Sequence, residues 1–204
     1  MTASQHTIAD RVLTMPVQIR KATQHNAMFA VDADAAQRLI DYSGLQVYRP
    51  FRGRAIATLI VAQFVDSDLG QYFEYSTCVM VKPPGADAAA VQSVFVAHMF
   101  VDQAFTLAAG RTIWGFPKAM ADFTVRDGKR FSFDASIDGR FVIGMEFARG
   151  LAVPPTLAPG RQELRAYSCL DGTTRESPYE VSFHGVRYRP GGVRIRLGRH
   201  PYAK

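Results

Sequence analysis

The stretch Gly110–Phe123, with the sequence GRTIWGFPKAMADF, is the part of this chain around which we interpret the rest. Its unusual feature is a single lysine, Lys118, in apolar and aromatic surroundings. The flanking residues are Trp114, Phe116, Pro117, Ala119, Met120 and Ala121, with Arg111 the nearest other basic residue. Because a buried amine is costly to charge, the free base becomes available near neutral pH and can attack a ketone to form an iminium. The alternative interpretation is an exposed lysine whose aliphatic stem covers Trp114.

The pattern GR-x-IWGFPK-x-x-A-D resembles the lysine motif of the acetoacetate decarboxylase family. In that family the lysine forms a Schiff base with a keto-acid substrate, which implies this role for Lys118. The segment Asp68–Ser76, DLGQYFEYS, resembles the part of the family that carries an active-site glutamate, which implies that Glu74 is catalytic. More loosely, the resemblance extends from about Met15 to Tyr202. It implies a curved sheet that closes into a cone-like barrel around the lysine, and a homo-oligomer.

Two positions depart from the family pattern. Acetoacetate decarboxylase is itself the standard example of a lysine activated by desolvation or by a cationic neighbour, and it has a second lysine directly after the nucleophile. This chain has Ala119 there, so activation of Lys118 would depend mostly on burial. The family's arginine near the first strand aligns with Ala22, although Arg20 and Lys21 are close enough to replace it. The substrate-binding residues that we predict are Arg20, Trp114, Phe116 and Met120.

The residue pattern around Glu74 predicts a long strand over Gln71–Lys82. Alternation along a strand places Glu74 on one face with Tyr72, Ser76, Cys78 and Met80. A carboxylate among small and apolar side chains is either functional or turned out to solvent at the beginning of the strand. The pattern alone does not choose between these two interpretations, and the family resemblance favours the functional one.

Length and composition predict one globular domain over residues 1–204, because 204 residues with 48% hydrophobic residues suffice for a substantial core. No apolar run reaches the roughly 18 residues of a membrane-spanning helix, and the N-terminal segment lacks the order of a signal peptide. We therefore expect a cytoplasmic enzyme with no membrane partner. The two cysteines and five histidines form no metal-ligand pattern, so we expect neither a metal nor a cofactor.

The formal charge of +6 comes from 24 basic and 18 acidic residues, and the excess lies late in the chain. In Val193–Leu197 two arginines alternate with apolar residues, as on the solvent-exposed face of a strand. No RNA-binding signature or recognition-helix pattern accompanies them. We therefore predict a solvated strand face and no nucleic-acid partner.

Residue patterns along the chain predict about ten strands and two or three short helices, a mainly antiparallel β (α+β) architecture with a curved sheet. The predicted helices are Thr7–Leu13, Ala35–Tyr42 capped by Asp32 or Asp34, and Asp102–Ala109 capped by Asp102 with Gly110 just beyond its end. Lys118 would then lie on a connection between a helix and a strand, where reactive groups are often presented.

Turn sequences divide the predicted strands. Asp127-Gly128 and Asp138-Gly139 predict hairpins that join three consecutive strands into a meander. The meander strands are Ala121–Arg126, Lys129–Ile137 and Arg140–Ala148. The other predicted strands are Leu45–Tyr48, Arg54–Asp66, Val91–Val101, Leu164–Cys169, Tyr179–Arg189 and Val193–Leu197, with a break at Pro83-Pro84-Gly85.

These features favour an enzyme in which Lys118 forms a Schiff base with a small keto acid and breaks a carbon–carbon bond. Decarboxylation is the parent reaction, but the departures at Ala119 and at the missing arginine predict poor activity on acetoacetate and better activity on a bulkier keto acid. An aldolase-dehydratase acting on pyruvate-like donors is the second interpretation, because the resemblance also covers enzymes of that kind. A non-catalytic small-molecule-binding domain with a relic lysine is the third. The family resemblance implies at least one more strand after the segment Arg199–Tyr202, whereas this sequence stops at Lys204. We therefore expect either a short member of the family or a truncated chain, with a sheet edge that another subunit covers.

Overall fold

The structure, a computed structural model, describes residues 4–83 and 92–203 of the chain. Strands dominate, with two α-helices and two short 3-10 helices among the described residues, so the expected mainly β architecture is confirmed. The residues form two compact units, which are described separately below. The first contains residues 1–120 and 165–177, and the second contains residues 121–164 and 178–204.

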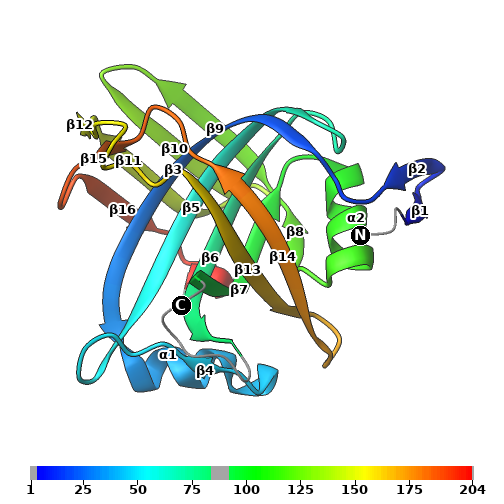
Figure 1. Ribbon diagram of the computed structural model, residues 1–204, viewed down its shortest axis with the longest axis horizontal. Coiled ribbons are helices and arrows are strands. Elements are labelled where there is room, and N and C mark those ends of the chain that lie inside the picture. Colours follow the sequence, from blue (N-terminus) through cyan, green and yellow to red (C-terminus); the bar gives the residue numbers. More distant parts are fainter. Residues whose placement is uncertain (1–3, 84–91, 204) are drawn as a thin grey trace. The chain divides into compact units, whose positions relative to one another are not determined.

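An eight-stranded sheet forms the framework of the first unit and curls strongly (Figure 1). Its main path runs in the order β14–β13–β7–β6–β5–β3, with β4 added beside β6 and β8 beside β7. The strands are β3 (Ile19–Asp32), β4 (Gln46–Val47), β5 (Arg54–Ser67), β6 (Tyr72–Lys82), β7 (Gln92–Val101), β8 (Lys118–Met120), β13 (Arg161–Cys169) and β14 (Thr174–Ser182), the last two contributing residues 165–177 to this unit. The start of the predicted strand at Val91 and the predicted break at Pro84-Gly85 lie outside the described residues.

Register within this sheet places the candidate glutamate in its middle. The ladders β3–β5, β5–β6 and β6–β7 are antiparallel, and Glu74 of β6 stands between Ala62 of β5 and Val101 of β7. Strand β8 runs parallel to β7, with Lys118 opposite Met99. Two residues that lie 44 positions apart in the sequence are therefore attached to neighbouring positions of one sheet, on either side of β7.

Helix α1 (Ala33–Ile40) begins two residues before the predicted Ala35. Its cap is Asp32, one of the two predicted caps, which accepts a hydrogen bond from the backbone N–H of Ala35 at 2.8 Å. The helix ends earlier than the predicted Tyr42 and continues as a 3-10 turn, η1 (Asp41–Ser43). Gly44 then ends the turn in the left-handed conformation that favours glycine.

Helix α2 (Ala104–Trp114) is longer than the predicted helix and has a different cap. The side chain of Gln103, not Asp102, caps it by accepting the backbone N–H of Thr106 at 2.9 Å. Asp102 instead accepts the backbone N–H of Phe73. The predicted end at Gly110 was wrong because Gly110 lies inside the helix, and Gly115 ends it in the left-handed conformation.

A hairpin replaces the helix predicted over Thr7–Leu13. Strands β1 (Gln5–Ile8) and β2 (Arg11–Thr14) pair antiparallel. Both turn residues, Ala9 and Asp10, have positive φ angles, as a tight two-residue hairpin turn requires. Alanine seldom adopts such an angle, so the local sequence gives no turn signal. Packing decides the structure instead, because Ile8 and Leu13 are buried in the same apolar cluster as α2 residues.

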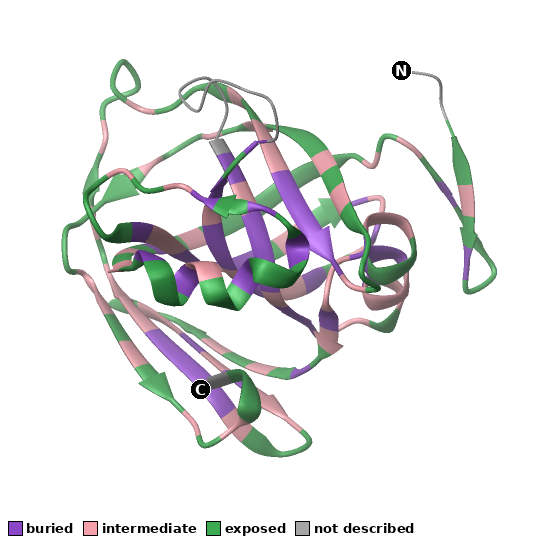
Figure 2. Cartoon of the chain, turned by 90° about the horizontal axis from the view of Figure 1, so that it is seen from below, coloured by how far each residue is buried: buried purple, intermediate pink, exposed green. Residues whose placement is uncertain are grey.

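The main apolar core of the first unit lies between α1 and the sheet. Ile40, Ala55 and Phe95 are fully buried there, with Val79 and Val81 of β6 beside them. Figure 2 shows the buried segments of this unit along its strands and on one side of its helices. Because β6 carries this core on its odd-numbered residues, its even-numbered residues, including Glu74, are free to form the site.

The second unit contains a four-stranded antiparallel sheet in the order β16–β11–β10–β9. Its strands are β9 (Asp122–Asp127), β10 (Arg130–Ile137), β11 (Arg140–Ala148) and β16 (Val193–Leu197), with a separate pair formed by β12 (Leu151–Ala152) and β15 (Arg187–Tyr188). Both hairpins of the predicted meander form, and the two-residue turn at Asp138-Gly139 is confirmed, because Ile137 pairs with Arg140. The predicted two-residue turn at Asp127-Gly128 was wrong, because Asp127 is the last residue of β9 and pairs with Phe131. The predicted single strand over Tyr179–Arg189 was wrong, because β14 ends at Ser182 and β15 pairs elsewhere. Arg194 and Arg196 are exposed, as the alternation in Val193–Leu197 predicted.

The burial of Phe95 leads to a stability prediction. The Phe95→Ala variant should lose about 3–5 kcal/mol of unfolding free energy, because truncation of a fully buried aromatic side chain leaves a cavity. Phe51 is 65% exposed and provides a matched control, for which the same truncation should change the free energy by less than about 0.5 kcal/mol. Urea unfolding followed by circular dichroism measures both. Equal losses for the two variants would contradict the described core.

Candidate active site

Lys118 is the first residue of β8 and is 5% exposed. Sequence analysis placed it on a connection, but the chain turns more sharply than expected. After α2 ends at Trp114, the backbone N–H of Phe116 returns to the carbonyl of Gly110, and the N–H of Lys118 bonds to the carbonyl of Phe116 at 2.7 Å. Strand β8 therefore starts at once beside β7, and the side chain of Lys118 points into the interior of the first unit.

The amine of Lys118 forms an ion pair with Glu74. Nζ lies 2.9 Å from Oε2 of Glu74, and the two side chains are only 4% and 14% exposed. Nζ also donates a hydrogen bond to Oγ1 of Thr106 at 3.1 Å, and it lies 5.4 Å from the centre of the Tyr72 ring. The structure thus brings together the two residues that the sequence named as catalytic, and it adds a hydroxyl group and an aromatic ring.

Gly110 makes room for the stem of Lys118. A Cβ atom at this position would lie 2.5 Å from Cε and 2.6 Å from Cδ of Lys118, far inside van der Waals contact. Thr106 lies four residues earlier on α2, so it shares a helix face with Gly110. The lysine side chain therefore runs along this face, with its stem against Gly110 and its amine at Thr106.

Two other ionisable groups near the pair stay protonated at neutral pH. Burial, with the charge of Glu74 as a smaller cause, raises the pKa of the Cys78 thiol to about 12. Burial and the nearby carboxylates of Glu74 and Asp102 also raise the pKa of Tyr72. Because a thiol attacks as its thiolate, this shift makes Cys78 a poor nucleophile at neutral pH.

The three apolar residues predicted to bind substrate, Trp114, Phe116 and Met120, lie in different surroundings. Trp114 is partly buried in the cluster that contains Tyr72, and Phe116 packs on the cluster that contains Cys78. The rings of Trp114 and Phe116 stack with centroids 6.2 Å apart. Met120 ends β8 and is 44% exposed.

Arg20, the predicted carboxylate-binding residue, is engaged elsewhere. Its guanidinium contacts Asp66 at 2.8 Å and Asp68 at 2.6 Å, and its side chain is 50% exposed. These two carboxylates raise the pKa of Arg20 further. The contacts described for Arg20 thus join β3 to the end of β5, and they involve neither Lys118 nor Glu74.

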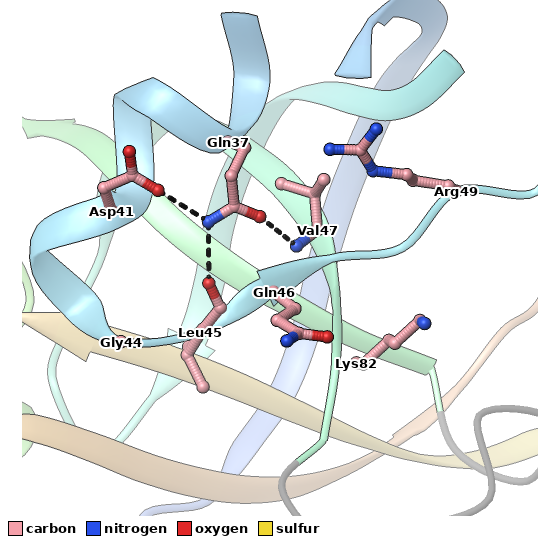
Figure 3. Close-up of a pocket in the computed structure, with 8 residues that line it drawn as sticks. All are labelled: Gln37, Asp41, Gly44, Leu45, Gln46, Val47, Arg49 and Lys82. Carbon is pink, nitrogen blue, oxygen red and sulfur yellow. Dashed lines mark hydrogen bonds between the residues drawn. The ribbon is translucent and has the colours of Figure 1, made fainter. Parts of the chain in front are cut away.

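Two hollows on the first unit do not have Lys118 or Glu74 among their lining residues. One, of about 550 Å³, is lined by Gln37, Asp41, Gly44, Leu45, Gln46, Val47, Arg49 and Lys82 (Figure 3). The other, of about 160 Å³, lies between β5 and β6 and has Tyr72 in its wall. Within residues 4–83 and 92–203 no cluster of three or more potential metal ligands occurs. No helix in the described part of the chain is long and apolar enough to cross a membrane.

Sequence reasoning did not identify Thr106, Gly110 and Tyr72 as parts of this site. Tyr72 precedes Glu74 by two residues, so strand alternation already placed both on one face. The four-residue spacing of Thr106 and Gly110 would have shown their common helix face, had the helix been extended past Gly110. That extension was missed because an interior glycine was interpreted as a helix end.

The acetoacetate decarboxylase family model matches residues 5–204. The chain belongs to the acetoacetate decarboxylase family. No curated protein sequence matches it significantly. The family match includes both Lys118 and Glu74 and spans residues of both compact units.

Solved structures of acetoacetate decarboxylases and related enzymes have a similar fold. Acetoacetate decarboxylase from Legionella pneumophila aligns with a TM-score of 0.65 and 17% identity, over 92% of this chain and 76% of that chain. An acetoacetate decarboxylase-like enzyme from Sphingomonas wittichii RW1 aligns with a TM-score of 0.56 and 18% identity, over 88% of this chain and 79% of that chain. The enduracididine biosynthesis enzyme MppR complexed with pyruvate aligns with a TM-score of 0.53 and 19% identity, over 85% of this chain and 82% of that chain. At these identities the similarity shows the fold.

The contact between Gly110 and Lys118 predicts an unusual coupling. Gly110→Ala in the wild-type protein should lower the free energy of unfolding by about 1–3 kcal/mol, because the added methyl group overpacks the lysine stem. In a Lys118→Ala background the lysine stem is gone, and Gly110→Ala should raise the free energy of unfolding by about 0.5–1 kcal/mol, because alanine has a better helix propensity than glycine.

Urea unfolding of the four proteins of this double-mutant cycle measures the coupling. The Lys118→Ala background is its own control, because any loss caused by the unpaired Glu74 is present with and without the methyl group. The same effect of Gly110→Ala in both backgrounds would show that the lysine stem does not lie against the helix.

Proposed function

We propose that this protein is a Schiff-base-forming carbon–carbon lyase that acts on a small keto acid, with Lys118 as nucleophile and Glu74 as its proton-transfer partner. The observation that carries the proposal is the ion pair between the Lys118 amine and the Glu74 carboxylate, 2.9 Å apart and largely shielded from water. Membership of the acetoacetate decarboxylase family supports the same reaction class.

The proposed reaction starts when Nζ of Lys118 gives a proton to Glu74 and attacks the ketone carbon. The carbonyl oxygen takes up two protons, both of which come from the Lys118 nitrogen through Glu74, and leaves as water, which gives an iminium. For a β-keto acid, the bond to the carboxylate carbon then breaks, carbon dioxide leaves, and the electron pair moves into the iminium to form an enamine. Protonation of the enamine and hydrolysis release the ketone and restore the amine.

Glu74 suits the proton-transfer role because its carboxylate already lies beside the reacting nitrogen. A general base must lie within hydrogen-bonding reach of the proton that it removes, and the 2.9 Å separation meets this requirement without movement. The hydroxyl of Tyr72 and the thiol of Cys78 have raised pKa values, so both are protonated at neutral pH and neither can act as the base. Glu74 is therefore the base in contact with Nζ.

Substrate selection follows from the charges and apolar groups of the site. Arg20 would bind a substrate carboxylate only in competition with Asp66 and Asp68. The position after the nucleophile is Ala119, which supplies no cation. Weak anchoring of the carboxylate and apolar side chains at Trp114, Phe116 and Met120 favour a bulkier keto acid over acetoacetate.

An aldolase-dehydratase on pyruvate-like donors is the second candidate. Its support is the fold similarity to MppR, a structure solved with pyruvate, and the same lysine can form the required enamine when a proton leaves the donor methyl group. A non-catalytic domain that binds small molecules is the third. The first two candidates require a covalent adduct at Lys118, whereas the third does not.

Reductive trapping tests the nucleophile. Wild-type protein incubated with borohydride and a panel of acetoacetate, pyruvate and bulkier keto acids should gain the mass of a reduced substrate adduct, and Lys118→Ala should gain none. Lys129→Ala, which removes an exposed lysine, should label as the wild type does. The bulkier keto acids should label faster than acetoacetate.

Intact mass spectrometry reads the outcome of this experiment. Labelling of Lys118→Ala as strong as that of the wild type would exclude Lys118 as the nucleophile. Turnover of acetoacetate at about 10 per second or more, the rate of an ordinary enzyme on its own substrate, would exclude the bulkier substrate.

Glu74→Gln tests the base. With the best-labelled keto acid, kcat should fall by about 10²–10⁴, the usual contribution of general acid–base catalysis, because an amide cannot take the proton. Glu146→Gln removes an exposed carboxylate that pairs with Arg130 and should leave kcat unchanged. Unaltered turnover in Glu74→Gln, with circular dichroism showing an intact fold, would mean that Glu74 has no part in proton transfer.

A further inference from the structure

The second partner of the Lys118 amine is a hydroxyl group that is completely shielded from solvent. Thr106 is 0% exposed, and its Oγ1 lies 3.1 Å from Nζ of Lys118. An ammonium group has three N–H bonds to donate, of which Thr106 accepts one, while the Glu74 carboxylate forms the ion pair with the same nitrogen. Nζ is therefore held from two directions, one from strand β6 and one from helix α2.

Thr106 is itself fixed from both sides. Its backbone N–H bonds to the side chain of Gln103 at 2.9 Å, and Gln103 also donates to the carbonyl of Leu69 at 3.3 Å. The Thr106 side chain also acts on the Tyr72 hydroxyl, whose pKa it lowers against the larger, opposite effect of burial. A threonine in a helix can otherwise turn its hydroxyl to a backbone carbonyl one turn earlier, and these contacts favour the orientation that meets Lys118.

The two partners of Nζ respond differently when the proton moves. Glu74 attracts the amine strongly while both groups are charged, and most of that attraction disappears once the carboxylate has taken the proton. Thr106 is uncharged throughout, and its oxygen accepts an N–H from either an ammonium or a neutral amine. The hydrogen bond to Thr106 is therefore the contact of Nζ that persists in the reactive state.

We propose that Thr106 is a positioning residue, which keeps the Lys118 nitrogen in place after its proton has moved to Glu74. This inference rests on the proposed function, because it assigns Thr106 a part in Schiff-base formation. In the step concerned, the nitrogen lone pair forms the bond to the carbonyl carbon and the C=O π electrons move to oxygen. The oxygen then accepts from Glu74 the proton that Glu74 had taken from the amine. One of the two N–H groups that remain on Nζ keeps its hydrogen bond to Thr106 during this attack.

Two substitutions separate the hydroxyl group from the shape of the side chain. Thr106→Val keeps the branched shape and removes the hydroxyl, whereas Thr106→Ser keeps the hydroxyl. Thr58→Val is the matched control, because Thr58 is a buried threonine of β5 that makes no contact with the amine among the described contacts. Circular dichroism and urea unfolding check that each variant is folded.

The first readout is the exchange of the Lys118 Nζ protons with water, measured by NMR on protein labelled with ¹⁵N at lysine. The wild type should show protected Nζ protons that are missing in Lys118→Ala. Loss of one hydrogen bond should speed their exchange about 10-fold in Thr106→Val, while Thr106→Ser and Thr58→Val keep the protection. Equal protection in wild type and Thr106→Val would overturn the proposal.

The second readout is the rate of reductive trapping with pyruvate and cyanoborohydride. At saturating pyruvate the trapping rate should fall about 10-fold in Thr106→Val, with little change in the half-saturating concentration, and Thr106→Ser should restore it. An unchanged rate in Thr106→Val would overturn the positioning role. A wild-type protein that traps no carbonyl compound would overturn the proposed function itself, and the Nζ exchange would still decide whether Thr106 holds the amine.

Discussion

The structure of the site depends on an ion pair that is largely shielded from water, between the ammonium of Lys118 and the carboxylate of Glu74. Neither charge could be buried alone at acceptable cost, and removal of one partner from such a pair typically costs about 3–5 kcal/mol. The pair also fixes two elements that are distant in sequence, because β6 supplies Glu74 and β8 supplies Lys118. The same contact that makes burial possible gives the amine a proton acceptor.

The surrounding chain makes this contact possible in three ways. The antiparallel register places Glu74 beside Val101 of β7, and the parallel addition of β8 places Lys118 on the other side of β7. Helix α2 leaves space for the lysine stem at Gly110, which has no side chain, and it provides a hydroxyl group at Thr106. A strand, a short parallel strand and one helix face are thus combined around a single nitrogen atom.

Much of this arrangement could be predicted from the sequence, and the exceptions share a cause. The hairpin at Asp138-Gly139 follows from local turn chemistry, and the closeness of Lys118 and Glu74 follows from the family resemblance with strand alternation. The hairpin at Ala9-Asp10 was not predictable, because packing imposes positive φ angles on residues that give no turn signal. Likewise, Gly110 looks like a helix end in sequence, yet it is there because the lysine stem occupies the space of a side chain. Tertiary contacts decided both cases.

The central claim is that Lys118 and Glu74 together form the reactive centre. A crystal structure of the protein after borohydride reduction in the presence of its best keto acid tests this claim most directly. Our account predicts density that continues from Nζ of Lys118 into the substrate carbons, with the Glu74 carboxylate within hydrogen-bonding distance of that nitrogen. An unmodified Lys118, with the reduced adduct on another of the chain's five lysines, would contradict it.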